Sequence, residues 1–251
     1  MSLLPDYSRQ ATDYDETRGA SPSVLRALEA ALEGAPGPRL ADIGGGTGNY
    51  ALAFRQRSWT PVVVDRSPAM LGRAAGKGVE VVEADAEALP FADQSFDAAM
   101  LISMLHHVSD RPAALREARR VLRPGGRLAV LAFTDTDAAS LWVLDYFPVS
   151  REWMAATHPP RDELLSEMPG ATRIDFAFED MEDASLAASS ADPRRILEAA
   201  RGGGTSYFER MRRDHPEQLE AGVDRLRADI DAGRAPSHPG TATVLSWGKP
   251  A

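Results

Sequence analysis

The stretch LADIGGGTGNY, from Leu40 to Tyr50, decides the fold of this chain. An apolar run ends at Asp42 and Ile43, and four glycines then fall within five residues. Glycines directly after a strand let the chain turn sharply, and they let backbone N–H groups approach a ligand without a Cβ in the way. We therefore expect a strand here, followed by a ligand-binding bend.

The spacing of the glycines indicates which ligand they approach. A dinucleotide site has the pattern G-x-G-x-x-G/A, but reading from Gly44 the sixth position is Asn49. The pattern that fits is an acid followed by alternating glycines, Asp42-x-Gly44-x-Gly46-x-Gly48. An acid repels a diphosphate and attracts a cationic amino-acid end. The sequence therefore predicts a ligand that carries a positive group and needs no phosphates.

Strands and helices are expected to alternate around this bend. Apolar runs predict five strands, at residues 38–44, 59–67, 78–86, 96–105 and 126–134. Helices are expected at residues 50–57, 68–75 and 111–122, and a first helix from Ser21 as N-cap to Gly34 as C-cap. Apolar strands separated by helices predict an α/β fold with a parallel, doubly wound sheet. Ligands of such sheets bind beyond the carboxyl ends of the strands.

Composition narrows the classes of function. Apolar residues make up 43% of the 251 residues and charged residues 26%, which is typical of a globular protein. The net charge of −9 argues against a nucleic-acid substrate, because binding a phosphate backbone requires a basic surface. No apolar run approaches the roughly 20 residues that span a bilayer, and the first residues do not read as a signal peptide. We expect a cytoplasmic protein that has no membrane partner and, with no cysteine, no thiolate chemistry.

Five motifs in order carry a resemblance to a known family. DIGGGTG, VVVDRSPAML, EADAEALPF, FDAAMLISMLHHV and VLRPGGRLAV resemble the motifs of class I S-adenosylmethionine-dependent methyltransferases. The resemblance is close over residues 42–134 and greatest to the branch of ubiquinone- and menaquinone-type and natural-product small-molecule enzymes. It implies a Rossmann-like sheet of seven strands in the order 3-2-1-4-5-7-6, with the last strand antiparallel. Residues 171–178 and 241–249 are then the sixth and seventh strands.

The resemblance implies S-adenosyl-L-methionine as cofactor and a set of residues that bind it. These are Asp42, Gly44, Gly46, Gly48, Asp65, Met70, Asp85, Ala86 and Ser103. Asp65 is expected to hydrogen-bond both ribose hydroxyls, and Asp85 to accept from the exocyclic amine of adenine. Met70 would pack against adenine, and the Ala86 N–H would meet a ring nitrogen. The alternative for each acid is a plain capping role at the start of the next helix.

The first residues have a signal of their own. YSRQATDYDETRG places Tyr14 and Arg18 ahead of the first helix, and a similar segment in the family folds over the cofactor as a lid. Arg18 would then reach the cofactor carboxylate, and Tyr14 the methionine end. The alternative is a frayed tail.

Two histidines are the candidates for catalysis. His106 and His107 follow the fourth strand, at the mouth where acceptor and cofactor should meet, and we expect His106, or else His107, to act as a general base. The alternatives are that both only pack in a loop, and that catalysis works by proximity alone. No metal site is expected, since His158, His215 and His238 are isolated from one another in the sequence.

Residues after the fifth strand should select the acceptor. The candidates that would line its pocket are Met104, at the end of the fourth strand, and then Trp142, Tyr146, Phe147 and Tyr207. The aromatics have an equally good alternative role in attaching a helical insertion to the core. We expect a lid and first helix at residues 1–34, a cofactor-binding core at 35–178 and 240–251, and a helical insertion over the active site at 179–239.

The expected function is transfer of a methyl group to an O, N or C atom of a small organic acceptor. Alternatives are a quinone-ring C-methyltransferase, a non-catalytic protein that binds the cofactor, and a nicotinamide-dependent (NAD) oxidoreductase on a similar sheet. The acid at Asp42 and the missing glycine at Asn49 count against the oxidoreductase.

Overall fold

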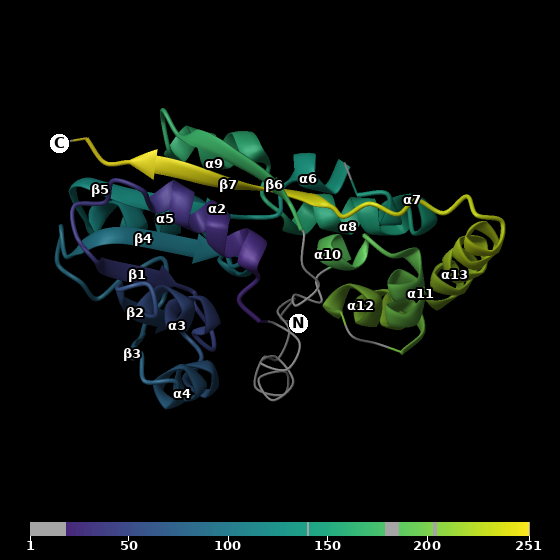
Figure 1. The fold of residues 1–251 in the computed structure, drawn as a ribbon, viewed down its shortest axis with the longest axis horizontal. Coiled ribbons are helices and arrows are strands. Elements are labelled where there is room, and N and C mark those ends of the chain that lie inside the picture. The colour runs from purple at the N-terminus through teal and green to yellow at the C-terminus, as the bar shows by residue number, and fades with distance from the viewer. Residues whose placement is uncertain (1–18, 140, 179–185, 203–204, 251) are drawn as a thin grey trace.

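The computed structural model describes residues 19–139, 141–178, 186–202 and 205–250. Strands in these residues form one seven-stranded sheet in the order β3-β2-β1-β4-β5-β7-β6 (Figure 1). The strands are β1 (Arg39–Ile43), β2 (Thr60–Asp65), β3 (Glu80–Glu83), β4 (Phe96–Ile102), β5 (Leu122–Leu131), β6 (Thr172–Ala177) and β7 (Thr241–Gly248). β7 runs antiparallel to β5 and β6, while the remaining neighbours are parallel. The expected strand order and the antiparallel last strand are confirmed.

Helices cover both faces of the sheet. Those that flank its strands are α2 (Pro22–Leu32), α3 (Asn49–Arg55), α4 (Pro68–Gly76), α5 (Arg111–Arg120) and α9 (Arg161–Glu167), with a 3-10 turn η1 (Leu105–His107) after β4. α2 and α3 share one apolar cluster with β1, while α5 and α9 share another with the opposite face. β2 is buried through Val62, Val63 and Val64, as a strand covered on both faces requires.

The ends of two predicted helices differ from expectation. Ser21 caps α2 as predicted, and its Oγ accepts from the Val24 N–H at 3.4 Å, but the C-cap is Glu33 rather than Gly34. Gly34 is the residue directly after this C-cap, and its φ of 81° gives it the left-handed conformation that commonly ends a helix. α5 ends at Arg120 and β5 begins at Leu122, because Leu122 already pairs with β4.

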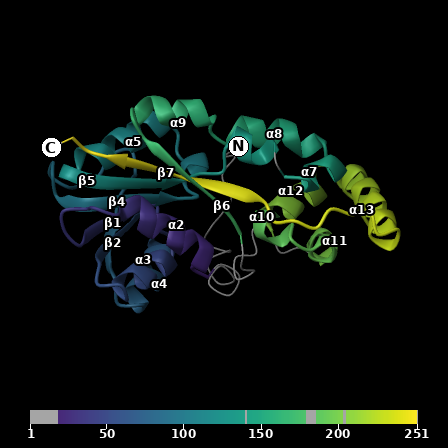
Figure 2. The same ribbon diagram turned by 45° about the horizontal axis from the view of Figure 1, so that its top comes forward.

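A helical layer lies beyond the edge at which the parallel strands end (Figure 2). It contains α6 (Asp135–Ala139), α7 (Val143–Tyr146), α8 (Val149–Thr157), α10 (Leu186–Ser189), α11 (Pro193–Gly202), α12 (Ser206–Asp214) and α13 (Pro216–Asp231). The buried side chains of Phe147 and Phe208 meet at 5.4 Å between ring centroids, so segments before and after β6 pack together. The layer therefore draws on more of the chain than residues 179–239. In the part of the chain described here, no helix has the length and apolar character to cross a membrane.

Candidate functional site

The bend after β1 is shaped by glycines in conformations that other residues avoid. Gly44, Gly46 and Gly48 have φ values of 70°, 55° and 73°. A Cβ on Gly44 would lie 2.8 Å from Cγ of Met104, so the bend also passes closely under the end of β4. A Cβ on Gly46 would meet nothing within 4 Å. The bend is thus closed on one side and open on the other, as a backbone surface for a ligand must be.

Asp42 is a buried carboxylate next to this bend. Asp42 is only 1% exposed, and neither of its carboxylate oxygens has a hydrogen-bond partner among the described residues. Burial, and then the charge of Asp65, raise the pKa of Asp42 from 3.8 to about 7. The backbone N–H of Ala51 works against this rise without meeting the geometry of a hydrogen bond. A cationic ligand would offset the cost of this unpaired carboxylate.

Asp65, at the end of β2, joins the glycine bend to the next helix. One carboxylate oxygen accepts from the Gly46 N–H at 3.0 Å, and the other accepts from the Ser67 N–H at 2.9 Å. The cap of α4 is Ser67, so the simple capping alternative does not describe Asp65. Each carboxylate oxygen retains acceptor capacity for a further partner. Met70, in the first turn of α4, is buried.

The segment after β3 is ordered by carboxylates that accept from backbone N–H groups. Asp85 is exposed, and its Oδ1 accepts from the Glu87 N–H at 2.9 Å. Glu87 Oε1 in turn accepts from the N–H groups of Ser109 (2.6 Å) and Asp110 (3.0 Å), ahead of α5. Ala86, between the two acids, is buried. The structure thus brings the segment after β3 against the loop after β4.

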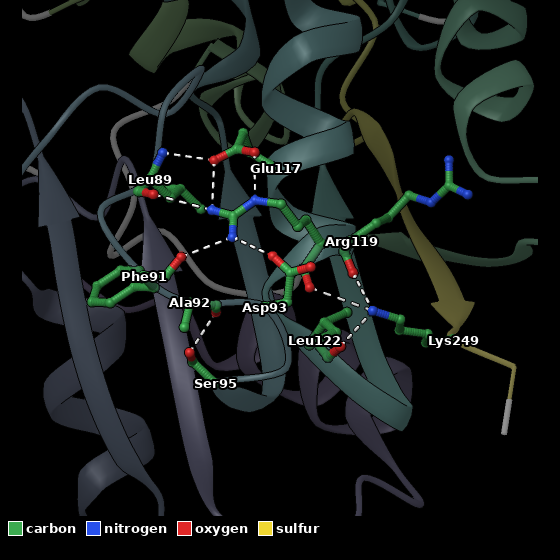
Figure 3. Close-up of polar contacts among 10 residues, drawn as sticks. Leu89, Phe91, Ala92, Asp93, Ser95, Glu117, Arg119, Leu122 and Lys249 are labelled. Carbon is green, nitrogen blue, oxygen red and sulfur yellow. Dashed lines mark hydrogen bonds and ion pairs between the residues drawn. The ribbon is translucent and has the colours of Figure 1, made fainter.

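Arg120 anchors the far end of that segment to α5 (Figure 3). Its guanidinium donates to the carbonyls of Leu89 at 3.0 Å and Phe91 at 2.8 Å. Glu117 accepts from Arg120 at 2.7 and 2.8 Å, and also from the Leu89 N–H at 2.8 Å. Lys249 donates to the carbonyl of Arg119, near the end of α5, at 3.0 Å and to that of Leu122, at the start of β5, at 2.6 Å. These contacts join the chain segment before β4 to the helix after it, and so restrain the segment that carries Asp85.

The end of β4 has an unusual backbone. Ser103 has a φ of 51°, which is uncommon for a residue other than glycine, and its N–H donates to the Leu131 carbonyl at 2.8 Å. Such strain is concentrated at functional sites. The Ser103 residue is exposed, while the next side chain, Met104, is buried over Gly44.

Three histidines meet beside this strand end. His106 and His107, in η1, have ring centroids 3.7 Å apart, and His158 stacks on His106 at 5.3 Å. Burial, then Arg66 and His158, lower the pKa of His107 to about 4. Sequence reasoning missed His158, because no local pattern announces that the end of α8 folds back onto η1. No group of three or more His, Asp or Glu side chains in the described ranges is placed to hold a metal ion.

The aromatic residues expected to line an acceptor pocket have partners within the helical layer. The Tyr207 hydroxyl donates to Ser150 Oγ at 2.8 Å, and the Tyr146 hydroxyl donates to Asp229 at 2.9 Å. The Trp142 Nε1–H donates to the carbonyls of Ser190 (3.1 Å) and His238 (3.2 Å), and Phe147 is fully buried. These contacts favour the second expected role, attachment of the layer. Contact with an acceptor stays a prediction.

Tyr14 and Arg18 lie outside the described residues. An open hollow of about 550 Å³ is lined by the end of α2 and by residues before β1 and β2, including Glu29, Arg57 and Trp59. This hollow lies at the amino ends of the strands, whereas ligands of such sheets bind at the carboxyl ends.

Comparisons with known proteins match the part of the chain that builds the site. Residues 41–130 match the family model described as Methyltransferase domain. The demethylmenaquinone methyltransferase of Thermus thermophilus is 45% identical over 116 residues, which are 43% of this chain and 52% of the relative. The ubiquinone/menaquinone biosynthesis C-methyltransferase UbiE of Paracoccus denitrificans is 40% identical over 157 residues, 56% of this chain and 63% of the relative. The chain thus spans about half the length of the curated relatives it matches, between 44% and 63%.

Solved structures extend the likeness beyond the matched segment. An Anabaena variabilis protein described as a methyltransferase from an antibiotic biosynthesis pathway has a TM-score of 0.75 and 25% identity, and the likeness covers 93% of this chain and 99% of that one. A S-adenosylmethionine-dependent methyltransferase from Thermotoga maritima has a TM-score of 0.56 and 26% identity, covering 71% and 87%. The first likeness includes the helical layer as well as the sheet.

Proposed function

We infer that this chain, a class I S-adenosylmethionine-dependent methyltransferase, transfers the methyl group of its cofactor to a small organic acceptor. The family match over residues 41–130 and the order of the sheet support the class. The observation that carries the proposal is the buried carboxylate of Asp42, which has no hydrogen-bond partner among the described residues and borders an open glycine bend. A diphosphate would be repelled there, whereas a cationic amino-acid end would be held.

The residues present fit this cofactor. Asp42 supplies the negative charge that its cationic end requires, and the glycine bend supplies backbone without a Cβ. Asp65 has acceptor capacity left for two ribose hydroxyls after its bonds to Gly46 and Ser67. Asp85 and Ala86 would meet the adenine ring. When bound, the cofactor supplies a methyl group already activated on a sulfonium.

The protein's part in the reaction is alignment. Methyl transfer from a sulfonium is an in-line displacement in which charge disperses, so positioning and exclusion of water contribute most. Ser103 and Met104, at the end of β4, would pass beneath the cofactor, and the helical layer stands over the same edge of the sheet (Figure 2). His106 and His107, in η1, lie directly after this strand end, where the acceptor would approach, and catalysis by proximity alone is the alternative to a general base.

Calorimetry tests the choice of ligand. We expect S-adenosylmethionine and S-adenosylhomocysteine to bind the chain and NAD to show no heat of binding. Incubation with labelled S-adenosylmethionine and a panel of phenols, hydroquinones and amines then tests catalysis. Tight binding of NAD with no response to S-adenosylhomocysteine would overturn the proposal. Binding without any methylated product would favour the non-catalytic alternative.

The relatives support one narrower candidate, C-methylation of a quinol ring. Enzymes named for demethylmenaquinone and ubiquinone are 40–45% identical over their matched segments. A demethylmenaquinol with a short side chain, offered in the same assay, is therefore the first acceptor to try. Mass spectrometry and NMR of the product would show whether the new methyl group is on carbon or on oxygen. An O-methylated product would exclude the narrower candidate and leave the broader proposal intact.

A further inference from the structure

We propose that His158 acts as the general base of the reaction. Its Nε2 removes the proton from the O–H or N–H group of the small molecule that receives the methyl group. This assignment rests on the proposed function. It names a residue of the helical layer, rather than one of the two histidines that follow β4, as the group that takes the proton.

The position of His158 supports this role. It is the residue directly after α8, and its ring packs between two side chains from the carboxyl edge of the sheet. The His106 ring stacks on it at 5.3 Å and 24°, and the Phe133 ring, just after β5, meets it at 5.4 Å and 75°. His106 lies two residues after Met104, whose side chain covers Gly44. His158 therefore stands where the layer meets the strand ends nearest the glycine bend.

Hydrogen bonds determine which ring nitrogen carries the proton. Nδ1 of His158 lies 3.1 Å from the Met154 carbonyl oxygen, which can only accept, so Nδ1 must be the donor. Thr157 Oγ1 lies 3.1 Å from the same nitrogen and already donates to the Trp153 carbonyl at 2.8 Å, so it too presents a lone pair to Nδ1. In the neutral ring Nε2 is then the unprotonated nitrogen. No described residue hydrogen-bonds to Nε2.

One guanidinium holds the two histidine segments together. Arg111 donates through Nε to the Leu105 carbonyl in η1 at 3.2 Å, and through Nη2 to the Thr157 carbonyl at 3.0 Å. Its third nitrogen lies 3.5 Å from Glu163. The backbone directly before each of the two stacked histidines is thus restrained. The ring of His158 is therefore oriented before any acceptor arrives.

The surroundings keep this imidazole uncharged at neutral pH. Burial lowers the pKa of His158, the Met154 carbonyl raises it, and Arg111 and Arg210 lower it further, with a net fall below 6.5. His107 adds no cation near neutrality, since burial lowers its pKa to about 4. Both arginines also pair with acids, Arg111 with Glu163 at 3.5 Å and Arg210 with Asp214 at 3.6 Å. His158 is therefore in its base form at pH 7.

The proposed step is balanced in atoms and charge. For a hydroxyl acceptor, the O–H bond breaks and its proton passes to Nε2 of His158. The oxygen electron pair forms the bond to the methyl carbon, and the carbon–sulfur bond breaks with its electron pair remaining on sulfur. The products are a methyl ether, a neutral thioether and an imidazolium. The imidazolium then returns its proton to water, which a pKa lowered from the ordinary value of His favours.

Two variants and one control isolate Nε2. His158→Asn retains an N–H donor near the position of Nδ1 and has no group at Nε2, while His158→Gln places a non-basic amide near Nε2. His238→Asn, at an exposed histidine elsewhere, is the control. With the best phenol, hydroquinone or amine of the panel, we expect kcat to fall 10²-fold or more in both His158 variants. The KM for S-adenosylmethionine and the calorimetric affinity for S-adenosylhomocysteine should be unchanged. We expect the kcat of the wild type to fall in acid, below pH 6.5, as His158 becomes protonated. Neither variant should show this fall.

A second measurement needs no turnover. Nitrogen-15 NMR of histidine-labelled protein should show His158 neutral at pH 7, with its proton on Nδ1, and removal of that signal in the variants assigns it. A proton on Nε2 would overturn the proposal, as would a kcat within threefold of wild type with an unchanged pH profile. Failure of the proposed function looks different, because S-adenosylhomocysteine would then not bind. The nitrogen assignment decides the proposal even if no member of the panel is methylated.

Discussion

Asp42 shows how one residue can be costly to the fold and useful to the site. Its carboxylate is buried, has no hydrogen-bond partner in the described chain and lies close enough to Asp65 to feel its charge. Removal from water makes the ionised form expensive. A carboxylate in this state does not stabilise the fold, so its role lies elsewhere, and binding a cation is the simplest such role.

Asp42→Asn should therefore stabilise the cofactor-free chain at alkaline pH. Folding raises the carboxyl pKa from 3.8 to about 7, so the folded chain keeps a proton that the unfolded chain loses in this window. The contribution of Asp42 is favourable below pH 3.8 and is lost as the pH rises to 7. At about 1.4 kcal/mol per pH unit the upper limit of the effect is about 4 kcal/mol. Urea unfolding at pH 5 and pH 8 measures it.

The same variant should bind S-adenosylmethionine more weakly, by tenfold or more, which calorimetry at pH 8 would show. A variant that is less stable than wild type at pH 8, or that binds the cofactor equally well, would contradict this view of Asp42.

Asp65→Ala should weaken cofactor binding by about 1–3 kcal/mol, because it leaves hydroxyls unpaired and also frees the Gly46 N–H that shapes the bend. Asp65→Asn keeps one acceptor oxygen and should lose less. The control is Asp224→Ala, whose side chain on α13 is 74% exposed. Calorimetric affinities for S-adenosylhomocysteine separate the cases, and equal affinities for Asp65→Ala and wild type would refute the ribose assignment.

At the scale of elements, the helical layer is attached by close packing between segments from both sides of β6. Gly222, in α13, faces α7 so closely that a Cβ there would overlap the Phe147 ring and lie 2.6 Å from the Tyr146 carbonyl oxygen. Phe147 is fully buried and cannot move aside without a cavity. Alanine ordinarily stabilises a helix more than glycine does, but at this contact α13 requires glycine because a Cβ has no room.

Gly222→Ala should lower the free energy of unfolding by about 1–3 kcal/mol, since the overlap outweighs the gain of up to about 1 kcal/mol in helix propensity. Gly72→Ala is the matched control. It lies inside α4, where a Cβ would meet nothing within 4 Å, so it should be neutral or stabilising. Urea unfolding of both variants tests the pair, and destabilisation by Gly72→Ala alone would show that packing at α7 is not the cause.

Most elements could be predicted, whereas several of their ends could not. Val62 to Val64 form an apolar, β-branched run whose local preference is for a strand, and Ser21-Pro22 is a local cap. The start of β5 at Leu122 depends instead on pairing with Phe96 in another strand. Pairing partners are tertiary information, so the sequence placed that boundary too late.

Over the molecule as a whole, the proposed cofactor site draws on the ends of β1, β2, β3 and β4. Binding should therefore stabilise the complete sheet. At 100 times its dissociation constant, S-adenosylhomocysteine should add about 2.7 kcal/mol, which corresponds to a rise in Tm of about 5–10 °C for a chain of this size. Thermal unfolding with and without the ligand measures this. An equal rise with NAD would count against the proposed class.

The bend and the acids around it could be recognised from local sequence, because each depends on residues close together in the chain. Asp42 and its glycines, and Asp65 at the end of an apolar run, are local patterns, and the sheet follows from their alternation with helices. Only the tertiary structure decided that Asp65 accepts from the Gly46 N–H, and that His158 stacks on His106. Those contacts join residues far apart in sequence, and packing between elements, rather than any local preference, brings them together.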